Sequence, residues 1–457
     1  MQAKRTVCLR QLGETRAGEV RFGRFLANAK VSPERLIGSI CAATAQRAAG
    51  RHVLLIEDTT ELNYQAHAQR VRGLGTVGNG RDAGLFLHPL LAVDAQDGAC
   101  LGLAGIHMWL RTKKASPAYR ALPIEDKESH RWLSTVEAGQ KCLTGAARLT
   151  VVADRESDIY EMWDRLPDAR TDLLLRACRD RMVDTDTDTD TDTEIKTKAK
   201  TKIQTKSEML FSWLSSQPVA GSYTLAVRAR SGKRSAHQAL LQVRFGRIKI
   251  KRPRSCSDPN AAKSIEVSAL EVLECPSTVV GNEEPIHWRL LSTHPIETLE
   301  DACRLADWYS QRWHIEQTFR ALKRQGLDVE SSQVETAQGL MKLACLALDT
   351  AVRSIQLTLA REGQSHRPAS DVFTNGDIAL LGQLQPTLEG RTAKQKNPHQ
   401  APSLAWAAWI IARLGGWKGY ASERKPGPIT MHRGLVSFAL MATGWRAALG
   451  AKDVCMP

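Results

Sequence analysis

The stretch YSQRWHIEQTFRALK, residues 309–323, places four chemically different polar side chains at helical spacing. Tyr309, Arg312, Glu316 and Lys323 follow one another at intervals of three, four and seven residues. With about 3.6 residues per helical turn, these intervals return to nearly the same angle around the axis. The spacing therefore predicts one helix whose single face carries a phenol, a guanidinium, a carboxylate and an ammonium group. The carboxylate suits a divalent metal, and the cations around it suit a phosphodiester.

Two earlier segments each consist of an apolar strand that ends in a carboxylate. The first is VLLIED, ending at Asp58, and the second is LTVVAD, ending at Asp154. Strands that are apolar on both faces belong in a covered sheet, and ligands bind at the ends of such strands. Two aspartates at strand ends and one helical glutamate are typical of two-metal phosphoryl transfer. We therefore expect Asp58, Asp154 and Glu316 to be the catalytic and metal-binding residues.

Other polar residues near these positions are weaker candidates. Glu57 and Glu156 adjoin the two aspartates, but the periodicity of a strand or helix turns them away from the metals. His314 lies two residues from Glu316 and faces another side of the helix. We rank the two glutamates as second-choice ligands only.

The composition favours a nucleic-acid partner. Lys and Arg number 63 against 49 Asp and Glu in 457 residues, which gives a formal net charge of +14. Such an excess of positive charge attracts DNA or RNA, although a basic protein with no such partner has a similar composition. The length allows two or three domains.

The cysteines and the apolar runs bear on the compartment. Ten cysteines are scattered without a C-x-x-C pair, so neither a zinc site nor a disulfide framework is indicated. We expect them to be reduced core residues of a cytoplasmic protein. No apolar run approaches the roughly 20 residues of a membrane span, and the first residues lack the apolar stretch of a signal peptide. We expect no membrane association.

Taken together, these motifs resemble the DDE transposases of bacterial insertion sequences, in the group named for its Y-R-E-K helix. The resemblance runs from about Phe22 to the C-terminus. Besides the helix, it rests on the stretches IEDTTELNY, DKESHRW, ADRESDIY, IHWRLLSTHPI and AWIIARLGGW. It implies an α/β fold, with an RNase H-like catalytic core, a β-rich insertion and a C-terminal helical domain. It also implies two Mg²⁺ ions per site, replaceable by Mn²⁺.

The resemblance implies double-stranded DNA as partner, both transposon ends and target, and a homodimer in the DNA complex. It suggests three regions: residues 1–50 as a remnant of an N-terminal DNA-binding domain, 51–365 as the core with its insertion at about 180–295, and 366–457 as a helical dimerisation region. Most of the end-recognition domain of the family has no counterpart here, and residues 1–20 show no match.

The resemblance also assigns DNA contacts. Tyr309, Arg312 and Lys323 would bind phosphates near the cleaved end. Trp288 would stack on a base that leaves the duplex when a transposon end forms a hairpin; the alternative is a buried strand aromatic.

A basic segment offers a further DNA contact. In RIKIKRPR, residues 247–254, charged residues alternate with isoleucine. Arg247, Lys249 and Lys251 would share one strand face along a DNA backbone. The alternative is an ordinary charged edge strand.

Several elements can be predicted from local patterns. Residues 88–110 indicate a hairpin with its turn at Asp97-Gly98. The Asp-Thr repeat at 184–193 and the Lys-Thr-rich stretch at 196–206 have no apolar face, so we expect a surface loop. Residues 220–295 are rich in strand patterns. Residues 297–330, 333–362 and 403–414 indicate helices, and 434–449 is an amphipathic segment.

The C-terminal apolar stripes bear on assembly. We expect an exposed apolar patch for a homodimer, with packing on the protein's own core as the alternative. The stripes are Ala405, Trp406, Trp409, Ile410, Ile411 and Leu414, and Phe438, Leu440, Met441, Trp445 and Leu449.

Three functions are compatible with this sequence. The first is a cut-and-paste DNA transposase that hydrolyses DNA at transposon ends, forms a hairpin and transfers strands to a target. The second is an N-terminally truncated, non-catalytic inhibitor or relic that pairs with a full-length transposase. The third is a general RNase H-like nuclease, which Trp288 and the C-terminal helices disfavour.

Overall fold

The chain forms two compact units in the computed structural model. The structure describes residues 1, 4–78, 80–111, 119, 122–186, 205–227, 229, 234–324, 326–420 and 423–454. The first unit comprises Met1–Lys114, Ala138–Arg148 and Trp313–Pro457. The second comprises Ala115–Glu137 and Leu149–Arg312. Strands and helices occur in both, in agreement with the expected α/β class.

The first unit begins with three helices and a group of strands. The helices are α1 (Leu9–Gly13), α2 (Arg16–Ala27) and α3 (Pro33–Ala48), and α3 is capped by the Ser32 side chain, which accepts from the Arg35 amide. The strands are β1 (His52–Glu57), β2 (Thr60–Asn63), β3 (Gly75–Val77), β4 (Asp82–Asp94) and β5 (Cys100–Trp109). β4 pairs antiparallel with each of the other four.

The expected hairpin is confirmed as β4 and β5, although β4 begins six residues before His88. The turn lies at Asp97-Gly98, where Gly98 adopts a φ of 68° that other residues rarely tolerate. The Gly98 amide donates to the Asp94 carbonyl, and the Asp97 carboxylate accepts from the Ala99 amide.

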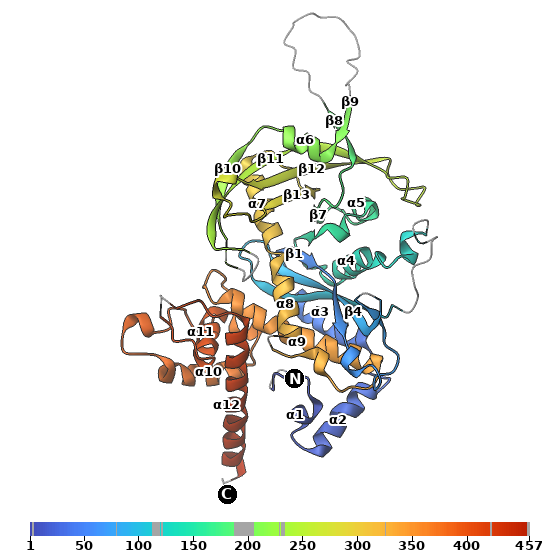
Figure 1. Ribbon diagram of the computed structural model, residues 1–457. Coiled ribbons are helices and arrows are strands. Elements are labelled where there is room, and N and C mark those ends of the chain that lie inside the picture. Colours follow the sequence, from blue (N-terminus) through green and yellow to red (C-terminus); the bar gives the residue numbers. More distant parts are fainter. Residues whose placement is uncertain are drawn as a thin grey trace, which may run out of the picture. The chain divides into compact units, whose positions relative to one another are not determined.

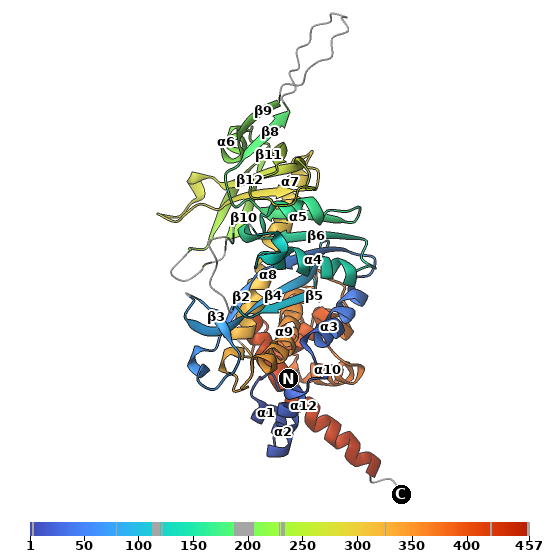
Figure 2. The same ribbon diagram turned by 90° about the vertical axis from the view of Figure 1, so that its right-hand side faces the viewer.

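The remaining helices of the first unit are α8 (Trp313–Lys323), α9 (Ala337–Ala360), α10 (Asn375–Leu388), α11 (Leu404–Leu414) and α12 (Pro428–Val454). In Figure 1, α3 and α9 lie against β4 and β5, and contacts join α9 to both α3 and β5. In both views α12 extends beyond α10 and α11 (Figure 2).

Helix α9 corrects the expectation that no apolar run approaches the length of a membrane span. By length and composition it could cross a membrane, yet 78% of its most apolar window is buried inside the protein. The core helix of a folded domain passes the same test. Lys342, Asp349 and Arg353 interrupt the run in the sequence and hid its apolar character.

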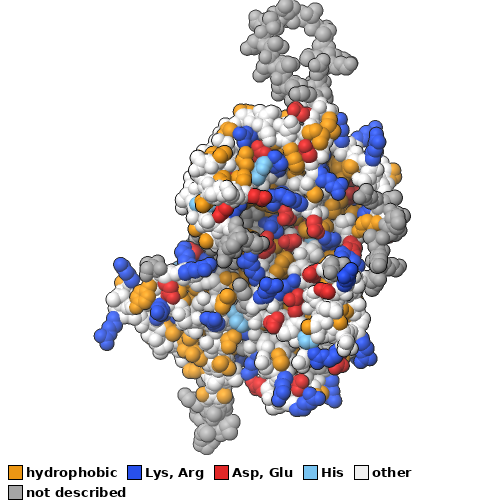
Figure 3. Space-filling model, viewed as in Figure 1, with side chains coloured by type: hydrophobic (Ala, Val, Ile, Leu, Met, Phe, Trp, Pro, Cys, Tyr) orange, Lys and Arg blue, Asp and Glu red, His pale blue; other side chains and the backbone are white. Residues whose placement is uncertain are grey.

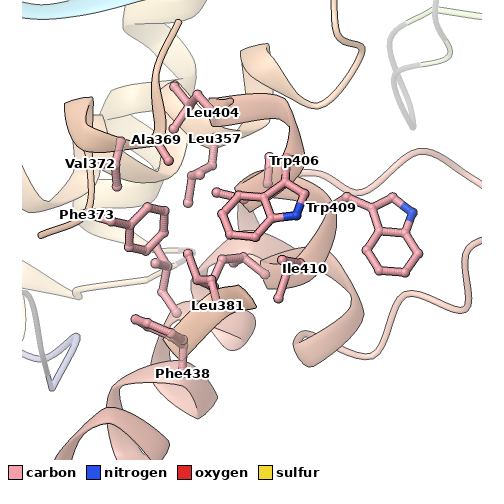
Figure 4. Close-up of a cluster of buried hydrophobic side chains, with 14 of the residues drawn as sticks. Leu357, Ala369, Val372, Phe373, Leu381, Leu404, Trp406, Trp409, Ile410 and Phe438 are labelled. Atoms are coloured by element: carbon pink, nitrogen blue, oxygen red, sulfur yellow. The ribbon is translucent and has the colours of Figure 1, made fainter. Parts of the chain in front are cut away.

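The apolar stripe of α11 faces inward. Trp406, Ile410 and Ile411 are buried in one cluster with residues of α9, α10 and α12. Figure 4 shows Phe373, Leu381 and Trp406 directed toward one another. The Trp406 indole also donates to the Gln385 side chain. The expectation that the α11 stripe is exposed is therefore wrong, because helices α9, α10 and α12 of the same unit cover it.

The α12 stripe is divided between core and surface. Phe438 belongs to the buried cluster, and Trp445 packs against its edge. Leu440 and Met441 are exposed, at 62% and 43%. Leu414 and Trp445 are half-buried, and the side chain of Leu449 lies outside the described residues. Leu440 and Met441 are thus the exposed part of the predicted patch that the structure describes.

The second unit contains a strand-rich sheet. Its strands are β6 (Arg148–Ala153), β7 (Thr171–Arg176), β8 (Met182–Asp186), β9 (Thr205–Met209), β10 (Gly221–Val227), β11 (His237–Lys251), β12 (Ser264–Glu274) and β13 (His287–Ser292). The order is β6-β7-β13-β12-β11-β8-β9, with β10 also on β11. β6 and β7 pair in parallel, and the other pairs within this unit are antiparallel. The strand-rich character of 220–295 is confirmed.

Helices complete the second unit. They are α5 (Tyr160–Arg165), α6 (Leu210–Ser216) and α7 (Leu299–Ser310), while α4 (His130–Cys142) runs across the boundary between the two sequence ranges. α7 starts with a capping box in which Thr298 and Asp301 exchange hydrogen bonds. α6 and α7 both contact β11.

The predicted single helix over 297–330 is wrong, since α7 ends at Ser310 and α8 begins at Trp313. At the junction the amide of Arg312 donates to the carbonyl of Tyr309, a bond over three residues instead of four. Tightening of the last turn in this way ends the α-helical ladder. Tyr309 therefore belongs to α7, and Glu316 and Lys323 belong to α8.

The cysteines were expected to be reduced core residues, and the structure agrees only in part. The nine described cysteines are free, and Cys41, Cys100, Cys275 and Cys345 are buried. Cys8 and Cys178, however, are exposed. The predicted surface loop is wrong at its two ends, because residues 184–186 belong to β8 and residues 205–206 belong to β9, which pair with each other. The residues between these ends lie outside the described part of the chain.

The inward packing of α11 can be tested by truncating one buried residue. Ile410→Ala should lower the free energy of unfolding by about 2–5 kcal/mol, because it leaves a cavity in the cluster. Ile429→Ala, at an exposed position of α12, is the matched control and should cost less than about 1 kcal/mol. Urea unfolding followed by tryptophan fluorescence measures both. Equal effects would contradict the buried position of α11.

Candidate active site

In the second unit, three side chains surround the carboxylate of Asp154, directly after β6. The Tyr309 hydroxyl donates to Oδ1 at 3.3 Å. The guanidiniums of Arg176 and Arg312 lie 3.8 Å from Oδ1 and Oδ2, respectively. The structure thus brings together three of the residues singled out in the sequence and adds Arg176.

Tyr309 is held as a hydrogen-bond donor. Burial, and next the neighbouring Asp154 carboxylate, raise the pKa of Tyr309 to about 12. The phenol therefore keeps its proton at neutral pH. Its ring meets the ring of Trp288 edge-on, with centroids 5.5 Å apart. Trp288 is partly buried, so it is neither a fully exposed platform nor a sealed core aromatic.

Arg176 was missed by the sequence reasoning, although a signal was present. It is the last residue of the apolar strand β7, as Asp154 is the first residue after β6. The two strands are parallel and Ala153 pairs with Leu175, so the next residues of both strands are neighbours. Applying the strand-end rule to cations as well as carboxylates would have found it.

A cavity of about 220 Å³ opens beside this cluster, within the second unit. It is lined by four basic side chains together with three smaller or apolar ones, namely Arg155, Arg176, His287, Arg289, Ala177, Cys178 and Phe211. The buried Glu271 carboxylate accepts from His287 at 2.8 Å and from Arg289 at 3.1 Å. These hydrogen bonds lower the pKa of Glu271 against the opposing effect of burial, the largest single influence. One carboxylate thus orients two of the basic side chains, and the cavity suits an anion.

In the first unit, Asp58 follows β1, and its Oδ1 accepts from the amide of Thr59 at 2.8 Å. Glu316 lies in the first turn of α8. Lys323 ends that helix 3.6 Å from the carboxylate of Glu330, which also accepts from the Asn63 amide. Because Asp154 belongs to the other unit, the convergence of the three carboxylates stays a prediction.

The second-choice residues have other partners. Glu57 is buried and lies 3.1 Å from the imidazole of His88. Glu156 is exposed and bound to Arg131 at 2.8 Å. Burial, and next the charge of Arg361, lower the pKa of His314 to about 4, so this side chain is neutral at physiological pH.

The basic face of β11 is partly neutralised. Ile248 and Ile250 are buried, so Arg247, Lys249 and Lys251 lie on the outer side as the alternation predicts. Arg247 lies 3.5 Å from both Glu266 and Glu297, and Lys251 lies 2.7 Å from Asp184. Exposed pairs of this kind are worth little, so a phosphate can displace them. Figure 3 shows basic and acidic side chains intermixed over the strand-rich part of the surface in view.

The comparison with protein families gives one finding. Residues 134–348 match the family model described as "Transposase DDE domain". The match supports a DDE transposase. Asp154, Glu316 and the whole segment from Tyr309 to Lys323 lie inside the matched residues, whereas Asp58 lies before them.

DDE transposases act with divalent metals, and the chemistry of the candidate donors fits such an ion. Carboxylate oxygens are the ligands that Mg²⁺ prefers, and the Asp154 side chain is about one-third exposed. Among the described residues, no group of three or more His, Cys, Asp or Glu side chains forms a ready metal site. The assignment of Asp58, Asp154 and Glu316 as metal ligands stays a prediction.

Arg176 provides a test of the cluster around Asp154. If its guanidinium binds a DNA phosphate, Arg176→Ala should weaken duplex binding roughly 3- to 10-fold and lower the salt slope of log affinity by about one. Lys263→Ala, which removes an exposed cation elsewhere in the second unit, is the control. Fluorescence anisotropy at several salt concentrations measures both. An unchanged slope for Arg176→Ala would exclude a phosphate contact.

Proposed function

We propose that this chain is a cut-and-paste DNA transposase of the Y-R-E-K group. The observation that carries the proposal is the cluster of Tyr309, Arg176 and Arg312 around Asp154, inside a segment that matches the transposase DDE domain. A carboxylate ringed by a protonated phenol and two guanidiniums offers oxygen ligands for a cation and donors for a phosphodiester at one place.

In this proposal Asp58, Asp154 and Glu316 hold the catalytic ions. When bound, two divalent ions activate the attacking water or 3′ hydroxyl and stabilise the leaving oxygen. Arg312 and Arg176 each exchange a 3.8 Å contact with Asp154 for a bidentate grip on a phosphate. Tyr309 keeps its proton and donates a hydrogen bond to a phosphate oxygen. Lys323, beside Glu330, adds a point charge farther along the strand.

The same proposal gives Trp288 and the neighbouring cavity a role in hairpin formation. Trp288 is partly exposed and lies against Tyr309, so it is within reach of the DNA end that Tyr309 binds. Stacking on an extrahelical base requires an aromatic face and is worth about 1–3 kcal/mol per base. The basic cavity would accept the phosphate of the displaced nucleotide.

We further propose that two chains assemble on DNA through α12. Cleavage of paired transposon ends requires two active sites, and Leu440 and Met441 present apolar surface outside the buried cluster. Burial of this apolar surface against a partner would favour association by about 25 cal/mol for each Å² removed from water.

The catalytic assignment predicts that carboxylate variants lose cleavage but keep DNA binding. Asp58→Asn, Asp154→Asn and Glu316→Gln should each lower Mg²⁺-dependent cleavage by at least about 100-fold, because each loses a charged metal ligand. The substrate is labelled duplex DNA from the regions flanking the gene, and Glu284→Gln, an exposed carboxylate, is the control.

The outcomes separate the candidate functions. Cleavage by Glu316→Gln at the unaltered rate would contradict the assignment. A chain that binds the duplex, cleaves it with neither Mg²⁺ nor Mn²⁺ and inhibits a full-length transposase upon mixing would instead support the regulatory function.

The assembly proposal predicts a change in mass on DNA. The unaltered chain should form a dimer with flanking duplex DNA, measured by light scattering, and Leu440→Ser with Met441→Ser should shift it toward the monomer. Val219→Ser with Val280→Ser, two exposed apolar positions of the second unit, is the control. A complex that stays monomeric without any substitution would refute the dimer.

A further inference from the structure

A buried chain of three side chains flanks Asp58 within the first unit. The imidazole of His88 lies 3.1 Å from a Glu57 carboxylate oxygen through Nε2 and 2.9 Å from the Thr59 hydroxyl through Nδ1. Both Glu57 and His88 are fully buried. One ring therefore contacts the residue before and the residue after Asp58.

The strand register explains this arrangement. β1 pairs with β4 as far as Glu57 opposite Leu90, and β2 resumes the same register with Thr60 opposite Leu87. The two residues between β1 and β2, Asp58 and Thr59, thus lie opposite Pro89 and His88. Pro89, opposite Asp58, has no amide hydrogen to donate to a neighbouring strand.

Side chains alternate between the two sides of an extended chain. Glu57 and Thr59 lie two apart and point to the same side, where His88 meets them. Asp58, between them, points to the other side. The contacts of His88 thus hold the residues on either side of Asp58.

The donor and acceptor at the two contacts of His88 depend on its tautomer. In the tautomer that carries the hydrogen on Nε2, the ring donates to Glu57 and its Nδ1 accepts from the Thr59 hydroxyl. The backbone amide of Thr59 in turn donates to Oδ1 of Asp58 at 2.8 Å. The chain of contacts thus runs from Glu57 through His88 and Thr59 to the carboxylate itself.

We propose that His88 and Thr59 are positioning residues that orient the Asp58 carboxylate toward a divalent cation. The proposal rests on the proposed function, in which Asp58 is a metal ligand. Side chains that hold a metal ligand in place typically contribute about 10- to 100-fold to metal affinity. A purely structural histidine would affect folding stability without this effect on the metal.

The test uses Mn²⁺ alone as the probe, with binding to the full chain measured by electron paramagnetic resonance. Thr59→Val removes the hydroxyl at nearly constant volume and should weaken Mn²⁺ binding about tenfold. Thr59→Ser restores the hydroxyl and should restore the affinity to within about twofold. Thr60→Val makes the same change one residue later, where the hydroxyl donates to the Glu61 carbonyl, and is the matched control.

Two further variants make the outcomes decisive. His88→Gln should weaken Mn²⁺ binding as Thr59→Val does, because it loses the contact at Nδ1. Asp58→Asn tests the premise: unchanged Mn²⁺ affinity in this variant refutes Asp58 as a ligand and overturns both proposals. Weak binding by Asp58→Asn with wild-type affinity in Thr59→Val overturns the positioning role alone. Thermal melting of each variant separates a change in affinity from a loss of folded protein.

Discussion

The antiparallel ladder centred on β4 is the constraint on which the first unit depends. β4 pairs with β1, β2, β3 and β5, so its register fixes four other strands. A slip of one residue would exchange the two faces of β1 and carry Asp58 to the side now occupied by Glu57 and His88. The buried residues of β1 and β4 oppose that slip, because it would disrupt the close packing on both faces of β1. Core packing and the direction of the Asp58 carboxylate are therefore set by the same pairing.

In the second unit, the basic side chains around Asp154 differ in burial from those on β11. Arg176 and Arg312 are mostly buried and lie near Asp154, so each cation has a compensating charge in the absence of DNA. Arg247 and Lys251 on β11 are more exposed and form pairs with carboxylates in a high-dielectric surrounding. A phosphate that approaches β11 meets exposed cations that attract its charge but do not fix its position. A phosphate that approaches Asp154 meets guanidiniums that are already held in place. In the proposed function, the Asp154 cluster is therefore the specific phosphate site and β11 is a general electrostatic surface.

Much of this arrangement could be predicted from residue patterns, and the exceptions have physical causes. Apolar runs ending in Asp58 and Asp154 indicated β1 and β6 because burial on both faces leaves a clear sequence signal. Arg176 was missed because the pairing of β7 with β6 is a long-range contact. The inward packing of α11 was missed because an apolar stripe does not reveal whether its cover comes from the same chain. The carboxylates that pair with β11 come from β8, β12 and the residues before α7, which no local pattern on β11 records.

The end of α7 shows why spacing alone misjudged the Y-R-E-K segment. Residues 309–316 contain neither glycine nor proline, so no conventional breaker marks the junction. The amide of Arg312 still donates to the carbonyl of Tyr309, three residues earlier, so the chain keeps turning although the α-helix has ended. The spacing of the polar residues therefore remains close to helical across the junction. Tyr309 and Arg312 consequently belong to the unit of Asp154, and Glu316 and Lys323 to the unit of Asp58. The pattern therefore describes a covalent junction that carries two phosphate-binding candidates on one side and a carboxylate with its lysine on the other. An insertion or deletion at this junction would change the number of residues between the two pairs while leaving all four side chains in place.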